Sequence, residues 1–369
     1  MITSHSRDAI FIITSDEPLG ETGNSHQHYC DVISDMHSVI FINPPPRWEL
    51  MSFLKKPKVK EVRKNLRVFC YHNYFPISFL KIFFTKLNDF INCYFLSRLL
   101  KRGQPVIFWK FDHFRMINPS FIQNFKTIYH VVDPVFRNKS DGLMASGADL
   151  VVTVNTAFTE HYKKLNPNIL YIPHGFRKEE LLPDFKKTEN VTGQYAPYFI
   201  ITGSINLDLD LELLDRISNE FSGHNLVLIG KEVLLDEQSR AEFKKLISKN
   251  NVHHLGPLHY MELKNYIAGA EICLVPYLTS RENFFRNPIK ITNYIAQLKP
   301  VINTVIIPEL KILENKIVFN ATTTDEFISS MKDVLNGTFQ VDKDFVKDYI
   351  SSHEYEKLVN QILDKLFEK

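Results

Sequence analysis

Short apolar segments alternate with longer amphipathic segments through the first half of the chain. The apolar segments are rich in Ile, Val and Phe, and each has the length of a strand. Uniformly apolar strands separated by helices are typical of a parallel sheet covered on both faces. We therefore predict strands over residues 8–15, 38–46, 67–71, 105–110, 127–133, 149–155 and 168–173.

The same alternation starts again in the second half, after a charged and polar stretch over 177–197 that we interpret as a linker. Strands are expected over 198–205, 225–231, 251–256, 271–277 and 300–305. The pattern predicts an α/β protein with two doubly wound domains of similar size, over 1–176 and 177–350, followed by an amphipathic helix within 351–369. Two such domains place a ligand between them, at the carboxyl ends of their strands.

Charge is distributed unevenly, although the formal net charge is only +2. Residues 52–104 hold 12 of the 44 basic residues and only two of the 42 acidic ones, which leaves 32 basic and 40 acidic residues elsewhere. Residues 77–100 are expected to form a helix with a long apolar side, and this segment suits the surface of an anionic membrane. The alternative is a core helix flanked by a basic loop. No nucleic-acid partner is expected, because no binding motif accompanies the charge.

The four cysteines are scattered and predict neither disulfides nor a zinc site. No secretory signal and no membrane-spanning helix is expected from the apolar runs, which fits a cytoplasmic protein. The pair Asp208 and Asp210 is interpreted as acidity at the start of a helix, and no metal site is predicted.

Five stretches between residues 148 and 305 carry a resemblance to a known family: 148–176, 202–218, 225–232, 251–277 and 287–304. They resemble GT-B glycosyltransferases, especially bacterial enzymes that build capsules, teichuronic-type polymers and exopolysaccharides. The resemblance implies two Rossmann-like domains facing each other across a cleft, with the acceptor on the N-terminal domain and the nucleotide sugar on the C-terminal domain. It also implies a last helix that packs back on the first domain, no metal, and no cofactor, because the nucleotide sugar is a substrate.

The donor site implied by the resemblance begins at Asn287-Pro288-Ile289-Lys290. Proline suits the first turn of a helix, whose free N–H groups and a neighbouring lysine would bind a diphosphate. The alternative is a helix start with a surface lysine. Asn293 stands where many relatives have a ribose-binding glutamate, and Phe285 stands at the position of their earlier glutamate. These departures weaken any transfer of the paired-glutamate mechanism.

Four further residues are candidates for the nucleotide sugar. Gly203 and Ser204 follow the first strand of the second domain, where small residues let a phosphate approach the backbone, and a turn glycine with no ligand is the alternative. Lys231 follows the next strand, although a solvated lysine is the simpler interpretation. Tyr277 could border the base or simply pack in the core.

The acceptor side requires a base for the attacking hydroxyl. Asp133 ends a predicted strand and precedes a proline, so we assign it this role, with a turn or cap aspartate as the alternative. Gly23, His26 and His113 are expected near the acceptor, although His26 could instead lie on a solvated helix face. His174 and Gly175 are expected to line the interdomain cleft.

The sequence therefore predicts a metal-independent glycosyltransferase of the hexosyltransferase type, at the inner face of the plasma membrane. It would transfer a sugar from a UDP-sugar, or from a GDP-sugar, to a lipid-linked or polysaccharide acceptor. One alternative is a GT-B enzyme of another class, such as a nucleotide-sugar epimerase. Another is a non-catalytic GT-B scaffold, which the absent glutamates would suit.

Overall fold

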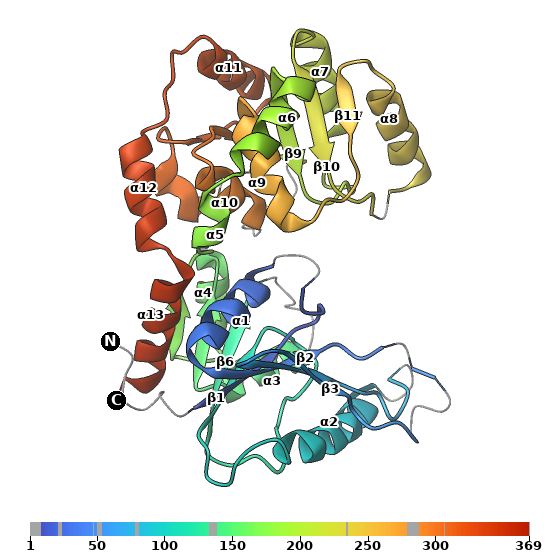
Figure 1. Cartoon of the computed structure of the whole chain (residues 1–369), viewed down its shortest axis with the longest axis vertical. Helices are drawn as coiled ribbons and strands as arrows, with labels where there is room; N and C mark the ends of the chain where they lie inside the picture. The colour runs from blue at the N-terminus through green and yellow to red at the C-terminus, as the bar shows by residue number, and fades with distance from the viewer. Residues whose placement is uncertain are drawn as a thin grey trace. The chain divides into compact units, whose positions relative to one another are not determined.

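The computed structural model describes residues 9–20, 24–46, 48–49, 54–77, 81–132, 139–233, 235–278, 288–305 and 307–368. The chain divides into two compact units (Figure 1). Unit 1 comprises Met1–Pro173 and Tyr355–Lys369, and unit 2 comprises His174–Glu354.

Unit 1 is built around an eight-stranded sheet in the order β3-β4-β2-β1-β5-β6-β7-β8. All neighbouring strands are parallel except the pair β3 and β4. Its elements are β1 (Ile10–Thr14), α1 (Ser25–Met36), β2 (Ser38–Asn43), β3 (Val59–Arg63), β4 (Leu66–Cys70), α2 (Lys81–Ser97), β5 (Val106–Lys110), β6 (Phe125–Val131), α3 (Lys139–Gly147), β7 (Leu150–Thr153), α4 (Thr156–Tyr162), β8 (Ile169–Tyr171) and α13 (Tyr355–Phe367).

Both faces of this sheet are buried, which explains its uniformly apolar strands. Along β1, Phe11 and Ile13 enter the core on one face, while Ile10 and Ile12 enter the core on the other. The first core contains α1 and α13, and the second contains α2. Each fully buried side chain of this size contributes roughly 1.5–3 kcal/mol.

Helix α13, at the C-terminal end of the chain, belongs to unit 1 and lies along α1 (Figure 1). Leu358, Val359 and Ile362 are each no more than 1% exposed and belong to the same core as α1. The apolar stripe of this helix is therefore buried by unit 1, although the stripe lies nearly 200 residues away from that sheet in the sequence.

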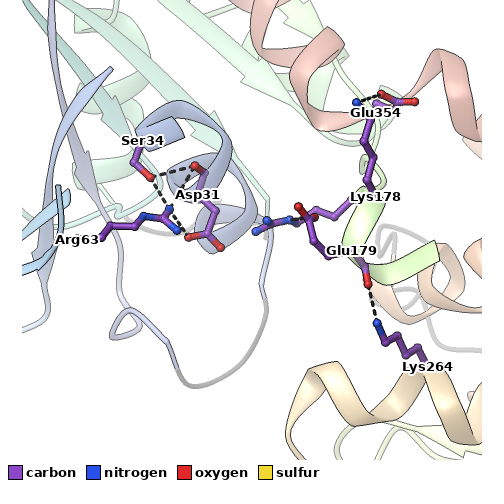
Figure 2. A network of polar contacts seen from close by, with 8 residues as sticks. Asp31, Ser34, Arg63, Lys178, Glu179, Lys264 and Glu354 are labelled. Atoms are coloured by element: carbon purple, nitrogen blue, oxygen red, sulfur yellow. Dashed lines mark hydrogen bonds and ion pairs between the residues drawn. The ribbon is translucent and has the colours of Figure 1, made fainter. Parts of the chain in front are cut away.

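Strand β3 was not predicted, because its sequence VKEVR is charged and all five residues are exposed. It is the edge strand of the sheet, where charged side chains discourage pairing with another chain. Arg63 donates to the carboxylate of Asp31 at 2.8 Å and also to Ser34, so it ties β3 to α1 (Figure 2). The sheet is consequently mixed at this edge rather than wholly parallel.

Helix α2 buries one side and exposes the other. Its asparagines hold the segment after β4: Asn92 accepts from the His72 N–H at 3.0 Å and donates to the His72 carbonyl at 2.8 Å. Cys93 and Leu96 are fully buried, whereas Phe83 and Phe90 are 62% and 50% exposed. The helix ends at Ser97 rather than at 100, and its apolar residues divide between the core and the exposed surface.

Unit 2 contains a parallel six-stranded sheet in the order β11-β10-β9-β12-β13-β14. Its elements are α5 (Lys178–Leu181), α6 (Phe185–Tyr195), β9 (Tyr198–Thr202), α7 (Leu211–Glu220), β10 (Asn225–Ile229), α8 (Glu237–Ile247), β11 (Val252–His254), α9 (Tyr260–Gly269), β12 (Ile272–Val275), α10 (Ile289–Ala296), β13 (Val301–Asn303), the 3-10 helix η3 (Pro308–Leu313), β14 (Val318–Asn320), α11 (Thr324–Leu335) and α12 (Lys343–Ser352). Strand β9 again divides its side chains between two cores.

The predicted linker over 177–197 is wrong, because most of it forms α5 and α6 within unit 2. The Asp184 side chain caps α6 by accepting from the Lys187 N–H, and Val191 and Tyr195 enter the core. Lys264 also donates to the Glu179 carbonyl at 2.7 Å (Figure 2). The charges that suggested a linker lie on the outer sides of these helices.

Candidate functional site

The strand order of unit 2 marks a ligand-binding edge. From β9 the chain moves outward through β10 to β11, and it then returns to place β12 on the other side of β9. In open parallel sheets, ligands bind outside the carboxyl ends of the strands at such a reversal. Gly203 follows β9 and Tyr277 follows β12 by two residues, so both lie at this edge.

Lys290 meets the turn after β9 at this point. Gly203 has φ +99°, a conformation that favours glycine, and a Cβ on Gly203 would lie 2.9 Å from the Lys290 Nζ. The same Nζ lies 4.9 Å from the centroid of the Tyr277 ring. The structure therefore brings Gly203, Tyr277 and Lys290 together, with the ammonium group against the backbone of the turn.

Helix α10 is held against the end of β9 by a buried tyrosine. The Tyr294 hydroxyl accepts from the Thr202 N–H at 2.8 Å and lies 3.0 Å from the Thr202 Oγ1. Pro288 is the N-cap residue of α10, with no side-chain cap bond, so the first-turn N–H groups have no cap from this residue. This end of α10 can attract an anion, and Lys290 adds a full positive charge.

A second glycine loop packs against the first. Gly230, after β10, comes so close to Gly203 that a Cβ on Gly230 would lie 1.8 Å from the Gly203 carbonyl oxygen. The Gly203 N–H donates to the Ile229 carbonyl at 2.9 Å, and the Ile205 N–H donates to the Lys231 carbonyl at 2.9 Å. Ser204 and Lys231 are exposed and Asn293 is half-buried. These backbone contacts fix the shape of the turn that faces Lys290.

Unit 1 has a corresponding reversal between β1 and β5. The buried Asp112, two residues after β5, accepts from the Phe114 N–H at 2.7 Å and pairs with Arg115. Arg115 also donates to the Ser15 carbonyl at 2.8 Å, just after β1. This pair therefore joins the two loops at the carboxyl edge, and Asp112 is a structural anchor there.

His113 is oriented by a chain of buried hydroxyl and carboxyl groups. Its Nδ1 lies 2.5 Å from the Tyr129 hydroxyl, which donates to Asp141 at 2.5 Å. Tyr162 donates to the same carboxylate oxygen at 2.7 Å. Burial and the Asp141 charge raise the pKa of Tyr129 well above its ordinary value, so the phenol keeps its proton.

The direction of these bonds decides the histidine tautomer. Because the Tyr129 proton points to Asp141, the phenolic oxygen accepts from His113, which places the neutral imidazole proton on Nδ1. In this tautomer Nε2 carries the free lone pair of the imidazole ring. His113 is thus a positioned proton acceptor at the edge predicted from the sequence.

His26, predicted near the acceptor, and His28 of the same helix occupy the core instead of a solvated face. His26 and His28 are 7% and 2% exposed. His26 lies between Phe41 and Phe111, and burial lowers its pKa to about 4. The His28 ring lies 5.1 Å from that of Tyr355 in α13. The solvated-face interpretation of His26 is wrong because Phe41 of β2 and Phe111 after β5 pack against its ring, and α13, distant in sequence, covers His28.

Three predicted site residues, Gly23, Asp133 and Asn287, lie outside the described residues. His174 and Gly175 are buried at the start of unit 2, between β8 and α5. Among the residues that the structure describes, no group of three or more His, Cys, Asp or Glu side chains is placed to hold a metal ion. Within the same residues, no helix has the length and hydropathy needed to cross a membrane.

A cavity of about 1010 Å³ lies at the carboxyl edge of unit 1. We call it the α2 cavity, because α2 contributes part of its wall. The other walls come from the segments after β2, β4 and β5 and from the start of α3. Its cationic lining residues Lys86, Arg115 and Lys139 were not singled out from the sequence. They come from three separate segments, so no local motif could have revealed them.

Comparison with solved structures identifies the fold. Sucrose-phosphate synthase from Thermosynechococcus elongatus matches with TM-score 0.70 and 13% identity over 97% of this chain and 99% of that chain. Anabaena Alr3699/HepE in complex with UDP and glucose matches with TM-score 0.70 and 13% identity over 96% and 98%. A UDP-forming trehalose-phosphate synthase from Burkholderia xenovorans, in complex with glucose-6-phosphate, matches with TM-score 0.70 and 9% identity over 98% and 100%.

The chain has the GT-B fold. The sequence prediction of two Rossmann-like domains is therefore confirmed. Comparison of the sequence with protein-family models and with curated proteins gave no match. The sequence prediction of this fold rested on the strand pattern and on the Asn287-Pro288-Ile289-Lys290 segment of this chain.

Proposed function

We propose that this chain is a glycosyltransferase that takes a sugar from a nucleotide-sugar donor, with a UDP-sugar favoured and a GDP-sugar as the alternative. The observation that carries the proposal is the convergence of Gly203, Tyr277 and Lys290 at the strand reversal of unit 2. A lysine at a glycine turn, beside a helix end that its N-cap residue Pro288 leaves without a side-chain cap, provides what a diphosphate requires. The UDP complexes of proteins with this fold support the choice of base.

Sugar transfer leaves negative charge on the departing nucleoside diphosphate. In this proposal the Lys290 ammonium and the first-turn N–H groups of α10 stabilise that charge, which needs no metal. Asn293, Ser204 and Lys231 complete the nucleotide-sugar site. Phe285 and Asn293 stand at the positions where many relatives have the two glutamates, so this site is proposed to bind the donor without that glutamate pair.

On the acceptor side, unit 1 holds the hydroxyl that attacks the sugar. We propose Asp133 as the base, on the sequence argument given above, and His113 as an acceptor contact through Nε2. The orientation of His113 by Tyr129 and Asp141 supports this assignment. Gly23, His174 and Gly175 remain proposed lining residues of the acceptor region.

The proposed acceptor is lipid-linked or a polysaccharide, with the protein held peripherally on the inner face of the plasma membrane. Exposed aromatic residues on α2 and its neighbouring loop support this: Phe83, Phe90, Tyr94 and Phe121 are 62%, 50%, 43% and 52% exposed. The nearby strand β3 carries the exposed Lys60. Arg63 and Lys55 contribute less to an anionic surface, because Asp31 and Glu49 pair with them.

Calorimetric titration with UDP and GDP tests the donor assignment. Lys290→Ala removes a charge-assisted contact worth roughly 1.5–3 kcal/mol, so the Kd for the bound nucleotide should rise roughly 10- to 150-fold. Lys311→Ala, which removes an exposed lysine of the same unit, is the matched control. Equal affinity in the Lys290 and Lys311 variants would contradict the proposed site. Absence of binding by either nucleotide would favour a non-catalytic scaffold.

Co-sedimentation with lipid vesicles tests the membrane assignment. We expect binding to vesicles of phosphatidylglycerol and weak binding to vesicles of phosphatidylcholine, because the proposed surface combines aromatic and basic side chains. Phe83→Ser should reduce binding, whereas Leu182→Ser, which changes an exposed residue of unit 2, should not. Equal binding to both vesicle types would refute an anionic membrane partner.

A further inference from the structure

The α2 cavity is placed where an acceptor would bind. Pro44 and Pro45 follow β2, Tyr71 follows β4, and Phe114 and Arg115 follow β5, so the cavity opens at the carboxyl ends of three strands. This is the ligand-binding edge of a parallel sheet. Its volume of about 1010 Å³ is at the upper end of the range for small-molecule sites, which is more than one sugar ring needs.

The fixed charges of the cavity favour an anion. Arg115 is paired with Asp112. Among the described residues of the cavity lining, Asp89 is the single carboxylate; it accepts a hydrogen bond from Tyr71 at 2.7 Å and is attracted to the buried Lys110. These two pairs leave the ammonium groups of Lys86 and Lys139, both on exposed residues. No ion pair of either lysine is found among the described residues.

The rest of the wall is apolar and continues onto the protein surface. Ile77, Phe90 and Leu143 line the cavity and are 40%, 50% and 56% exposed. The Phe90 ring lies 4.8 Å from that of Phe121, which lies 5.7 Å from the ring of Tyr94. A soluble sugar phosphate would use the lysines but leave these exposed apolar side chains in water, whereas an apolar partner would bury them.

We propose that the α2 cavity binds an acceptor that carries a phosphate or diphosphate on a long apolar alcohol. Lys86 and Lys139 contact the phosphate, and Ile77, Phe90 and Leu143 contact the first part of the apolar chain. The inference rests on the proposed glycosyltransferase function and narrows its acceptor class to a lipid phosphate. It also gives the aromatic surface of α2 a purpose, because the chain would continue from the cavity into the membrane.

Calorimetric titration of the full-length protein with four soluble probes separates the possible sources of the anion. The probes are farnesyl phosphate below its critical micelle concentration, farnesol, inorganic phosphate and glucose 6-phosphate. We expect farnesyl phosphate to bind at least tenfold more tightly than each of the others, because it alone has both parts. Glucose 6-phosphate binding as tightly as farnesyl phosphate would overturn the proposal in favour of a soluble sugar phosphate.

Two variants localise the binding to the cavity. The double variant Lys86→Ala/Lys139→Ala and the single variant Leu143→Asp should each weaken farnesyl phosphate at least tenfold. Lys101→Ala removes an exposed lysine of unit 1 outside the cavity lining and is the control. Unchanged binding in both cavity variants would show that the lipid binds elsewhere and would overturn the proposal.

UDP titration of the same samples keeps the two proposals apart. UDP binding that is retained in the cavity variants shows that they are folded and that the donor site is intact. Lipid binding without UDP binding would contradict the proposed donor and leave the cavity assignment standing. UDP binding without farnesyl phosphate binding would contradict the cavity assignment alone.

Discussion

Gly230→Ala is expected to damage the donor site more than any single loss of a side chain there. The added Cβ would lie 1.8 Å from the Gly203 carbonyl oxygen, whereas real Cβ contacts essentially never fall below 3.0 Å. One of the two loops must therefore move by about 1.2 Å, the difference between these values. The atom in the way is backbone, so no side-chain rotation can relieve the contact.

The cost follows from what holds the two loops. Backbone bonds of 2.9 Å join Gly203 to Ile229, Ile205 to Lys231, and Gly230 to Gly256. Overpacking of this kind costs about 1–3 kcal/mol, and a buried polar group left without a partner costs about 1–3 kcal/mol more. We expect unit 2 to lose about 3 kcal/mol of stability, which corresponds to roughly 6–12 °C in its melting temperature. UDP affinity should fall as well, because the shifted turn faces Lys290.

Hydrogen exchange measured by mass spectrometry can localise this loss to peptides of β9 and β10. Both tryptophans, Trp48 and Trp109, belong to unit 1, so tryptophan fluorescence serves as an internal control that should not change. Gly193→Ala, in the last turn of α6 with no atom beyond its chain neighbours and its own helix backbone within 4 Å of its added Cβ, should instead stabilise unit 2 by about 0.5–1 kcal/mol. Unchanged exchange in β9 and β10 of the Gly230 variant would refute the reasoning.

Further predictions concern single buried groups. Tyr294→Phe leaves the Thr202 N–H without its acceptor, so we expect the free energy of unfolding to fall by about 1–3 kcal/mol and UDP binding to weaken. Urea unfolding followed by circular dichroism measures the first effect, and an unchanged midpoint would contradict the role of this bond. Burial lowers the pKa of His26 to about 4, so as the pH falls the imidazole is protonated in the unfolded chain before it is protonated in the folded one. Stability should therefore fall by about 3 kcal/mol between pH 6.5 and pH 4, and His26→Phe should abolish this pH dependence. Burial raises the pKa of Asp89 to about 6 from an ordinary 3.8, so the contribution of Asp89 to stability falls by about 3 kcal/mol as the pH rises from 3.8 to 6, opposite in sign to that of His26. Asp89→Asn should therefore leave the pH dependence due to His26 by itself, so that the measured dependence becomes steeper. Parallel curves of stability against pH for the Asp89 and His26 variants would refute the two assignments.

The sequence by itself determined the fold class and singled out the glycine turn that we propose as part of the donor site. Buried parallel strands must be apolar on both faces, so their residues identify them without knowledge of their partners. Gly203 and Lys290 were found in the same way, because a glycine after a strand and a lysine after a proline at a helix start are local patterns. Charge misled the prediction at β3 and over 177–197, because exposed sides of strands and helices are as polar as loops.

Only the tertiary structure decided which distant residues meet. The contact of Lys290 with the Gly203 turn depends on the strand order, which places β12 beside β9. The burial of His28 beside Tyr355 follows from α13, which arrives from the other end of the chain. The orientation of His113 requires Tyr129 and Asp141 from two other elements. Local sequence records the backbone conformation and burial that a residue prefers, whereas a site is defined by distances between elements that the sequence separates.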